Sequence, residues 1–293
     1  MIKNRFFPAF ILTAVAAIWG SAFVVMKDTL QRLDVNSFLA WRFLVATLFL
    51  IVLRPSVLKS FDKAFLKKGL LIGTFLGSGY IFQSFGLTLT TVGKTGFITG
   101  LYVVLTPIVA ALFLKKNITK LEWGAVLLAT TGLALLSFKG FHIGLGEFLV
   151  LVSALLFAFH IVALGEWASD LDTYALTVLQ LGTCTFITFL ASLKSGFHVP
   201  PDAGVWRAII YTALFATSLA FIVQTWAQSF IPPATVGVIL AMEVVFAAIF
   251  GIWILNESLT LRIASGGLMV LLAMYAILFL DRSPTDMAGS TND

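Results

Sequence analysis

Apolar residues run through most of this chain in segments about twenty residues long, separated by short polar turns. A helix of that length crosses the roughly 30 Å hydrocarbon core of a bilayer. The pattern therefore predicts an all-α integral membrane protein with ten transmembrane helices. The expected spans are residues 8–26, 37–53, 69–87, 93–114, 121–138, 147–164, 174–193, 205–228, 233–257 and 262–280.

The two halves of the chain carry the same pattern. Residues of the third and fourth expected spans correspond to residues of the eighth and ninth at a constant shift of 141. The clearest pairs are Gln83 with Gln224, Gly96 with Gly237 and Tyr102 with Glu243. In the earlier spans the shift is 138, and the pairs are Trp19 with Phe157, Asp34 with Asp172 and Arg42 with Gln180.

Each unit of this pattern holds five spans, so the second unit must enter the membrane from the opposite side. We therefore expect two inverted five-helix repeats, an arrangement found in many secondary transporters. The expected repeats are residues 1–139 and 140–281. Residues 282–293 are polar and are expected to form a disordered cytoplasmic tail.

Composition and charge agree with a membrane protein. Hydrophobic residues make up 59% of the chain and charged residues 11%, whereas a soluble domain has about 25% charged residues. The net charge of +5 is small and scattered, which argues against a nucleic-acid partner. Of the 19 Lys and Arg residues, eleven fall on loops and ends that are cytoplasmic if the N-terminus lies inside, and seven on outer loops. This bias favours an N-in/C-in orientation, although nearly all of it comes from the first half.

Three polar residues stand out inside expected spans. Glu243 lies near the middle of the ninth span, where a charge is costly, so it is either a cavity or coupling group or a buried structural carboxylate. Arg42 lies about 9 Å inside the second span. It is interpreted as a structural charge that reaches outward or pairs with a carboxylate, with direct solute contact as the alternative. His160 is either a hydrogen-bonded core residue or a proton relay.

Aromatic and polar residues at repeated positions indicate a solute cavity, with simple packing as the alternative. The candidate solute-binding residues are Trp19, Tyr80, Gln83, Tyr102, His160, Gln224 and Glu243. Glycines at the start of the fourth span and at the repeated position in the ninth indicate a hinge, with static close packing as the alternative. These are Gly93, Gly96, Gly100 and Gly237. A further glycine series at Gly69, Gly73 and Gly77 indicates close contact between two helices.

Motifs of enzymes are missing from the sequence. There is no zinc-protease, nucleophile-elbow or phosphate-loop motif. Two of the three histidines fall in expected loops, which argues against a shared metal site. We therefore expect no catalytic residue, no metal and no cofactor, although spans alone do not exclude a membrane receptor or enzyme.

The sequence resembles the EamA family of drug/metabolite transporters in three features. These are the two five-span units, Arg42 in the second span, and the pair of fourth and ninth spans, of which the ninth ends near a turn containing Asn256 and Glu257. The resemblance covers nearly the whole chain and is greatest to the bacterial amino-acid and metabolite exporters. It implies a ten-helix carrier with a central cavity between its halves. Two positions depart from the family pattern. Val244 replaces the proline that usually follows the mid-span glutamate, and Lys116 replaces the usual acidic residue at the exit of the fourth span.

From the resemblance and the residues together, we expect a secondary transporter that exports small organic solutes across the bacterial inner membrane by alternating access. Amino acids, including aromatic ones, suit an aromatic, polar and nearly neutral cavity. A carrier for another metabolite or a drug-like compound is the alternative. The expected partners are the solute and membrane lipid. Proton coupling and the oligomeric state stay open, and a monomer is compatible with the sequence.

Overall fold

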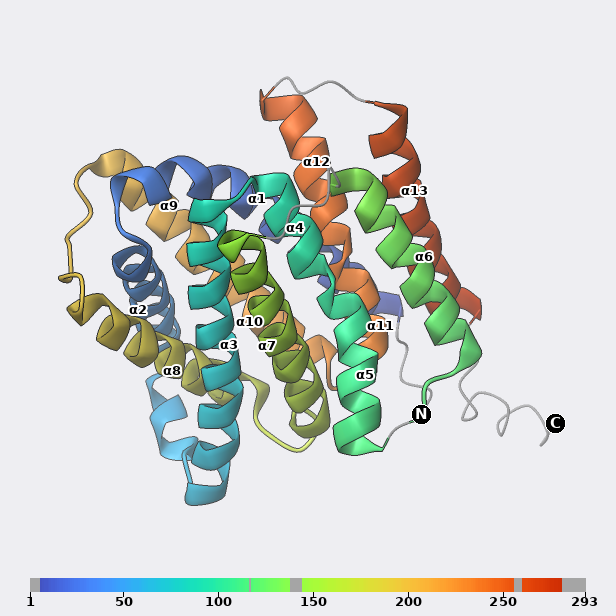
Figure 1. Cartoon of the computed structure of the whole chain (residues 1–293). Helices are drawn as coiled ribbons and strands as arrows, with labels where there is room; N and C mark the ends of the chain where they lie inside the picture. Colours follow the sequence, from blue (N-terminus) through green and yellow to red (C-terminus); the bar gives the residue numbers. More distant parts are fainter. Residues whose placement is uncertain (1–5, 116, 138–143, 256–259, 281–293) are drawn as a thin grey trace.

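The structure, a computed structural model, describes residues 6–115, 117–137, 144–255 and 260–280. These residues form a bundle of helices and no strand (Figure 1). The first-half helices are α1 (Phe6–Arg32), α2 (Val35–Leu53), η1 (Pro55–Ser60), α3 (Lys63–Leu89), α4 (Val92–Gly100), α5 (Tyr102–Leu114) and α6 (Lys120–Ser137). The second-half helices are α7 (Leu145–Trp167), α8 (Thr173–Leu193), α9 (Ala203–Ala213), η2 (Leu214–Leu219), α10 (Ala220–Ala227), α11 (Pro233–Leu240), α12 (Met242–Leu255), α13 (Leu261–Tyr275) and η3 (Ala276–Leu280).

Nine segments of the described chain are long and apolar enough to cross a membrane. They coincide with nine of the ten expected spans and confirm a multi-pass, all-helical membrane protein. The remaining expected span is α6, an 18-residue helix with Glu122 in its first turn. The expected tail at 282–293, Lys116, and the turn at Asn256 and Glu257 lie outside the described residues.

The fourth and ninth expected spans are each divided in two. α4 passes into α5 at Leu101, and α11 passes into α12 at Ala241. The expected ninth span is therefore present over the described residues, but it consists of two helices that meet at Ala241. The interruption forms at Ala241 although Val244 replaces the family's proline. Irregular backbone at this depth is tolerated where it lines a cavity and its polar groups keep partners.

The eighth expected span is also irregular. α9 and α10 are joined by η2, a π-helical turn. Such a turn widens the helix and shifts the backbone carbonyls relative to an α-helix, and it is often found at functional sites. Here it places the carbonyl oxygen of Ala216 where side chains of two other helices reach it, Trp19 from α1 and Arg42 from α2.

The strongest packing joins helices of the first half to helices of the second. α3 packs against α7 and α8, α2 against α8, and α1 against α12. Figure 1 shows α6 and α13 side by side at one edge of the bundle. The glycine series confirms its expected role, because a Cβ added at Gly73 would lie 2.7 Å from the carbonyl oxygen of Gln180 on α8. The halves are thus interleaved and do not form two separate bodies.

Ion pairs at helix ends also join the two halves. Arg54 lies 2.9 Å from Asp172, and Lys94 lies 2.8 Å from Glu147. Asp172 also caps α8, because its side chain accepts a hydrogen bond from the N–H of Ala175. Burial raises the pKa of Asp172, but the Ala175 hydrogen bond and Arg54 outweigh it, so its pKa lies below the ordinary value.

Candidate functional site

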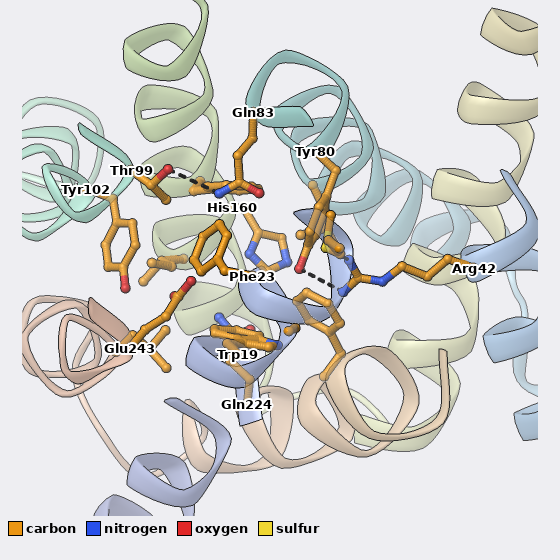
Figure 2. A pocket seen from close by; sticks show the side chains of 17 residues that line it. Trp19, Phe23, Arg42, Tyr80, Gln83, Thr99, Tyr102, His160, Gln224 and Glu243 are labelled. Carbon is orange, nitrogen blue, oxygen red and sulfur yellow. Dashed lines mark hydrogen bonds between the residues drawn. The ribbon is translucent and has the colours of Figure 1, made fainter. Parts of the chain in front are cut away.

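A central pocket lies where the two halves meet (Figure 2). It contains about 560 Å³ of space not filled by atoms, part of which is open. The lining residues come from nine helices of both halves: Trp19, Ala22, Phe23, Met26, Arg42, Leu76, Tyr80, Gln83, Thr99, Tyr102, Phe157, His160, Ile161, Phe221, Gln224, Leu240 and Glu243. All seven candidate solute-binding residues are in this lining.

Most of the lining consists of repeated positions. At a shift of 138 the pairs are Trp19 with Phe157, Ala22 with His160 and Phe23 with Ile161. At a shift of 141 the pairs are Tyr80 with Phe221, Gln83 with Gln224, Thr99 with Leu240 and Tyr102 with Glu243. The same shifts, applied to every candidate residue, would have found apolar lining residues such as Phe221, which no motif had indicated.

Glu243 stands in the first turn of α12, directly after the interruption at Ala241. Its side chain is 9% exposed, and its carboxyl group has no hydrogen bond or ion pair to another described residue. In Figure 2 this carboxyl group points into the pocket near Tyr102. The hydroxyl group of Tyr102 is buried and also lacks a partner within the described chain. The pocket therefore contains polar groups that the surrounding described protein does not satisfy.

Arg42 enters the pocket from the opposite side (Figure 2). Its side chain is 1% exposed, so it does not reach outward to the membrane surface. It donates to the hydroxyl of Thr217 at 2.7 Å, the carbonyl of Ala216 at 3.2 Å and the hydroxyl of Tyr80 at 3.5 Å. No carboxylate of a described residue lies within 4.0 Å of it. We expected Arg42 either to reach outward to the membrane surface or to pair with a carboxylate. The structure shows neither arrangement among the described residues.

Aromatic rings form the walls between Arg42 and Glu243. The indole N–H of Trp19 donates to the carbonyl of Ala216 at 2.8 Å, so the π-helical turn orients both Trp19 and Arg42. Trp19 packs against Phe221 with ring centroids 5.5 Å apart, and Tyr80 against Phe157 at 5.3 Å. These contacts leave the rings little freedom to turn.

Polar side chains of the pocket form hydrogen bonds with neighbouring amide and hydroxyl groups. His160 Nε2 lies 2.8 Å from the side-chain oxygen of Gln180, the repeated position of Arg42. Gln83 donates to Thr99 at 3.1 Å. Gln224 donates to Gln228 at 3.0 Å, and its own side-chain oxygen is buried without a partner among the described residues.

The candidate hinge glycines differ in how closely they are packed. A Cβ added at Gly96 would have Val244 as its nearest neighbour, at 3.9 Å, and one at Gly237 would meet only atoms 3.6 Å or more away. At Gly100 an added Cβ would lie 2.9 Å from Leu133. Gly93 lies in the first turn of α4. Gly100 directly precedes the interruption at Leu101, and Gly237 lies four residues before the interruption at Ala241.

Comparisons with known proteins show what this chain resembles in sequence and in fold. The sequence profile of the EamA-like transporter family matches residues 7–138 and again residues 144–279. An uncharacterized transporter of Archaeoglobus fulgidus is 35% identical over 91% of this chain and 84% of its own. The uncharacterized transporter YetK of Bacillus subtilis is 27% identical over 88% of this chain and 82% of its own. A crystal structure of a protein 15% identical in sequence has a TM-score of 0.79 and covers 93% of this chain and 96% of that one, which shows a shared fold.

Proposed function

Because this chain belongs to the EamA-like transporter family, we propose that it is a secondary carrier that exports amino acids, aromatic ones among them, across the bacterial inner membrane. The observation that carries this proposal is the central pocket. It combines aromatic walls, such as Trp19 and Phe157, with the unpaired carboxyl group of Glu243. In the proposed complex an ionised Glu243 accepts hydrogen bonds from the ammonium group of the solute.

Repeat symmetry supports the proposed architecture of ten helices in two inverted five-helix repeats, divided at residues 1–139 and 140–281. The hydroxyl groups of Thr47 on α2 and Thr185 on α8 lie 3.2 Å apart, and these residues are related by the shift of 138. A residue that touches its own counterpart lies next to a two-fold axis. In the proposed orientation both ends of the chain are cytoplasmic, which is the direction of the Lys and Arg bias.

Alternating access in this proposal uses the divided helices α4–α5 and α11–α12. Both interruptions lie beside the pocket, and a Cβ added at Gly96 or Gly237 would make only ordinary van der Waals contacts, so neither position is tightly packed. Rocking of one set of helices against the other would expose the same pocket to each side of the membrane in turn. Glycines 93, 96, 100 and 237 are the proposed hinge positions.

Counterflow in liposomes containing the purified protein tests the proposal. We expect trapped L-phenylalanine to drive uptake of labelled L-phenylalanine, with saturation and competition by other apolar amino acids. Glu243→Gln should weaken this exchange, whereas Asp170→Asn, an exposed acid in the turn after α7, should leave it unchanged. If no amino acid exchanges but another metabolite or a drug-like compound does, the proposed solute class is wrong. Failure of every solute to saturate or exchange would favour a receptor or an enzyme.

A further inference from the structure

The guanidinium group of Arg42 has donors that the described protein uses only in part. Five N–H groups are available on an arginine. Nε and Nη2 donate to oxygen atoms of Thr217, Ala216 and Tyr80. Nη1 has one partner, the thioether sulfur of Met26 at 3.6 Å, which is a weak acceptor. The Nη1 side of the group therefore lacks a strong acceptor, and Met26 is itself a lining residue of the pocket.

Burial makes this incomplete pairing costly. A cation removed from water requires an opposite charge or a full set of hydrogen bonds. The side chain of Arg42 is 1% exposed, and its hydrogen-bond partners among the described residues are all neutral. A structural cation would be stabilised by a buried carboxylate, and a neutral side chain would fill the same space at lower cost. The buried carboxyl group in the same pocket, Glu243, makes no ion pair with Arg42. An anion that arrives from the pocket would complete the contacts of the guanidinium group.

Tyr80 supplies a second donor beside this position. Its hydroxyl oxygen accepts the hydrogen bond from Arg42, so its own O–H remains available to donate. The ring is held by edge contacts with Phe43 and Phe157, both with centroids 5.3 Å from it. In Figure 2 the hydroxyl of Tyr80 lies next to the guanidinium group. Two donors on neighbouring atoms match the two oxygens of a carboxylate.

We infer that Arg42 and Tyr80 form the subsite that receives the carboxylate group of the transported solute. This inference rests on the proposed function and assigns the solute an orientation within it. The carboxylate lies against Nη1 of Arg42 and the hydroxyl of Tyr80, while the ammonium group faces Glu243 on the opposite wall. The apolar side chain lies among the aromatic rings that separate these charges. Arg42 is then a specificity-determining residue as well as a buried charge.

Three related compounds separate the two charged subsites. L-phenylalanine has both charged groups, phenethylamine lacks the carboxylate, and 3-phenylpropanoate lacks the ammonium group. Their affinities are measured by thermal stabilisation of the purified protein and by inhibition of labelled L-phenylalanine counterflow. For wild type, we expect phenethylamine to bind about ten- to a hundredfold more weakly than L-phenylalanine, the loss typical of one charge-assisted hydrogen-bonded contact.

Matched variants assign that loss to the subsite. Arg42→Gln, which introduces the residue found at the repeated position Gln180, should weaken L-phenylalanine and 3-phenylpropanoate about ten- to a hundredfold and leave phenethylamine unchanged. Glu243→Gln should weaken L-phenylalanine and phenethylamine and leave 3-phenylpropanoate unchanged. Arg207→Gln is the control, because Arg207 is an exposed arginine on α9 away from the pocket lining. It should change none of the three affinities.

Each outcome decides between the proposals. If Arg42→Gln binds each of the three compounds as tightly as wild type does, Arg42 does not receive the solute carboxylate and the inference is wrong. The proposal of amino-acid export is not affected by that result. If 3-phenylpropanoate binds in an Arg42-dependent manner but no amino acid exchanges, the subsite stands and the proposed solute class fails. Should Arg42→Gln not fold, Tyr80→Phe and the wild-type compound series replace it. Equal wild-type affinity for L-phenylalanine and phenethylamine then overturns the inference.

Discussion

At the scale of single residues, the polar groups without partners are the most informative. Six buried side-chain atoms of the described residues have no hydrogen-bond partner, and two of them, the hydroxyl of Tyr102 and the amide oxygen of Gln224, belong to the pocket lining. Leaving such a group unpaired costs about 1–3 kcal/mol. Both residues line the pocket, and Tyr102 lies close to Glu243 in Figure 2. A solute or water in the pocket would supply the missing partners.

Removal of the Tyr102 hydroxyl tests this interpretation. Tyr102→Phe should leave the thermal stability of the solute-free protein unchanged or slightly higher, because the hydroxyl makes no hydrogen bond there. Its affinity for L-phenylalanine should fall, since the solute loses one polar contact. Thermal unfolding with and without L-phenylalanine measures both effects.

Tyr174→Phe is the control for this prediction. The Tyr174 hydroxyl donates to the carbonyl of Leu50 at 2.6 Å and is not part of the pocket lining. Its loss should cost about 1 kcal/mol of stability and leave solute affinity unchanged. A Tyr102→Phe protein that is destabilised as much as Tyr174→Phe, with unchanged affinity, would make Tyr102 an ordinary packing residue.

At the scale of helices, three irregular segments lie beside the pocket: the two interruptions and the π-helical turn η2. The interruptions at Leu101 and Ala241 place Tyr102 and Glu243 at its wall, and the π-helical turn aims the carbonyl of Ala216 at Trp19 and Arg42. In a regular helix the carbonyl of Ala216 would accept a hydrogen bond from a backbone N–H of the same helix. These three segments therefore position Tyr102, Glu243 and the carbonyl of Ala216 near the pocket.

Glycine substitutions distinguish close packing from a hinge. A Cβ at Gly20 would lie 2.7 Å from the backbone nitrogen of Ala247 and 2.7 Å from the carbonyl oxygen of Glu243. Gly20→Ala should therefore cost roughly 1–3 kcal/mol of stability, because α1 and α12 must move apart. A Cβ at Gly96 would lie 3.9 Å from Val244, an ordinary van der Waals contact, so Gly96→Ala should fold normally while solute exchange slows. Thermal unfolding and counterflow rates measure the two effects.

The control for this series is Gly124→Ala, since an added Cβ at Gly124 meets nothing within 4 Å. It should change neither stability nor exchange. Normal expression, unchanged affinity and a full exchange rate in Gly96→Ala would remove the proposed hinge at this position. Normal stability of Gly20→Ala would show that α1 and α12 can move apart at little cost in free energy.

At the scale of the whole molecule, the interleaved halves imply that transport changes contacts between them. Ion pairs such as Arg54 with Asp172 and Lys94 with Glu147 join helix ends of opposite halves. Most residues of the pocket lining occupy corresponding positions of the two repeats. If a two-fold axis relates the repeats, both repeats contact one bound solute through the same positions. A movement that opens one side would then have a counterpart that opens the other.

Accessibility of introduced cysteines tests the inverted arrangement. Ser56 in η1 and Ser195 after α8 are both exposed and follow the second helix of each proposed repeat. In an inverted repeat they lie on opposite sides of the membrane. Ser195→Cys in intact cells should react with a membrane-impermeant thiol reagent, and Ser56→Cys should react only after permeabilisation. The native Cys184 is buried and should contribute little labelling. Reaction of both positions from the same side would rule out the inversion.

The sequence by itself determined the class of protein and much of the candidate site. Long apolar segments are a property of the chain alone, because a helix in lipid satisfies its own backbone and needs only length and hydrophobicity. The constant shifts between the halves are likewise visible without coordinates, and they brought Gln83, Gln224, Tyr102 and Glu243 together as candidates. The roles of these residues in solute binding stay predictions.

Only the tertiary structure decided where the helices break and what the buried charges contact. Arg42 is held by Thr217, 175 positions away along the chain, through a π-helical turn that has no local sequence signal. The sequence predicted a span over residues 233–257, and the structure divides its described part into α11 and α12 at Ala241. Such details arise from packing between the halves, where residues distant in sequence compete for the same space and the same hydrogen bonds.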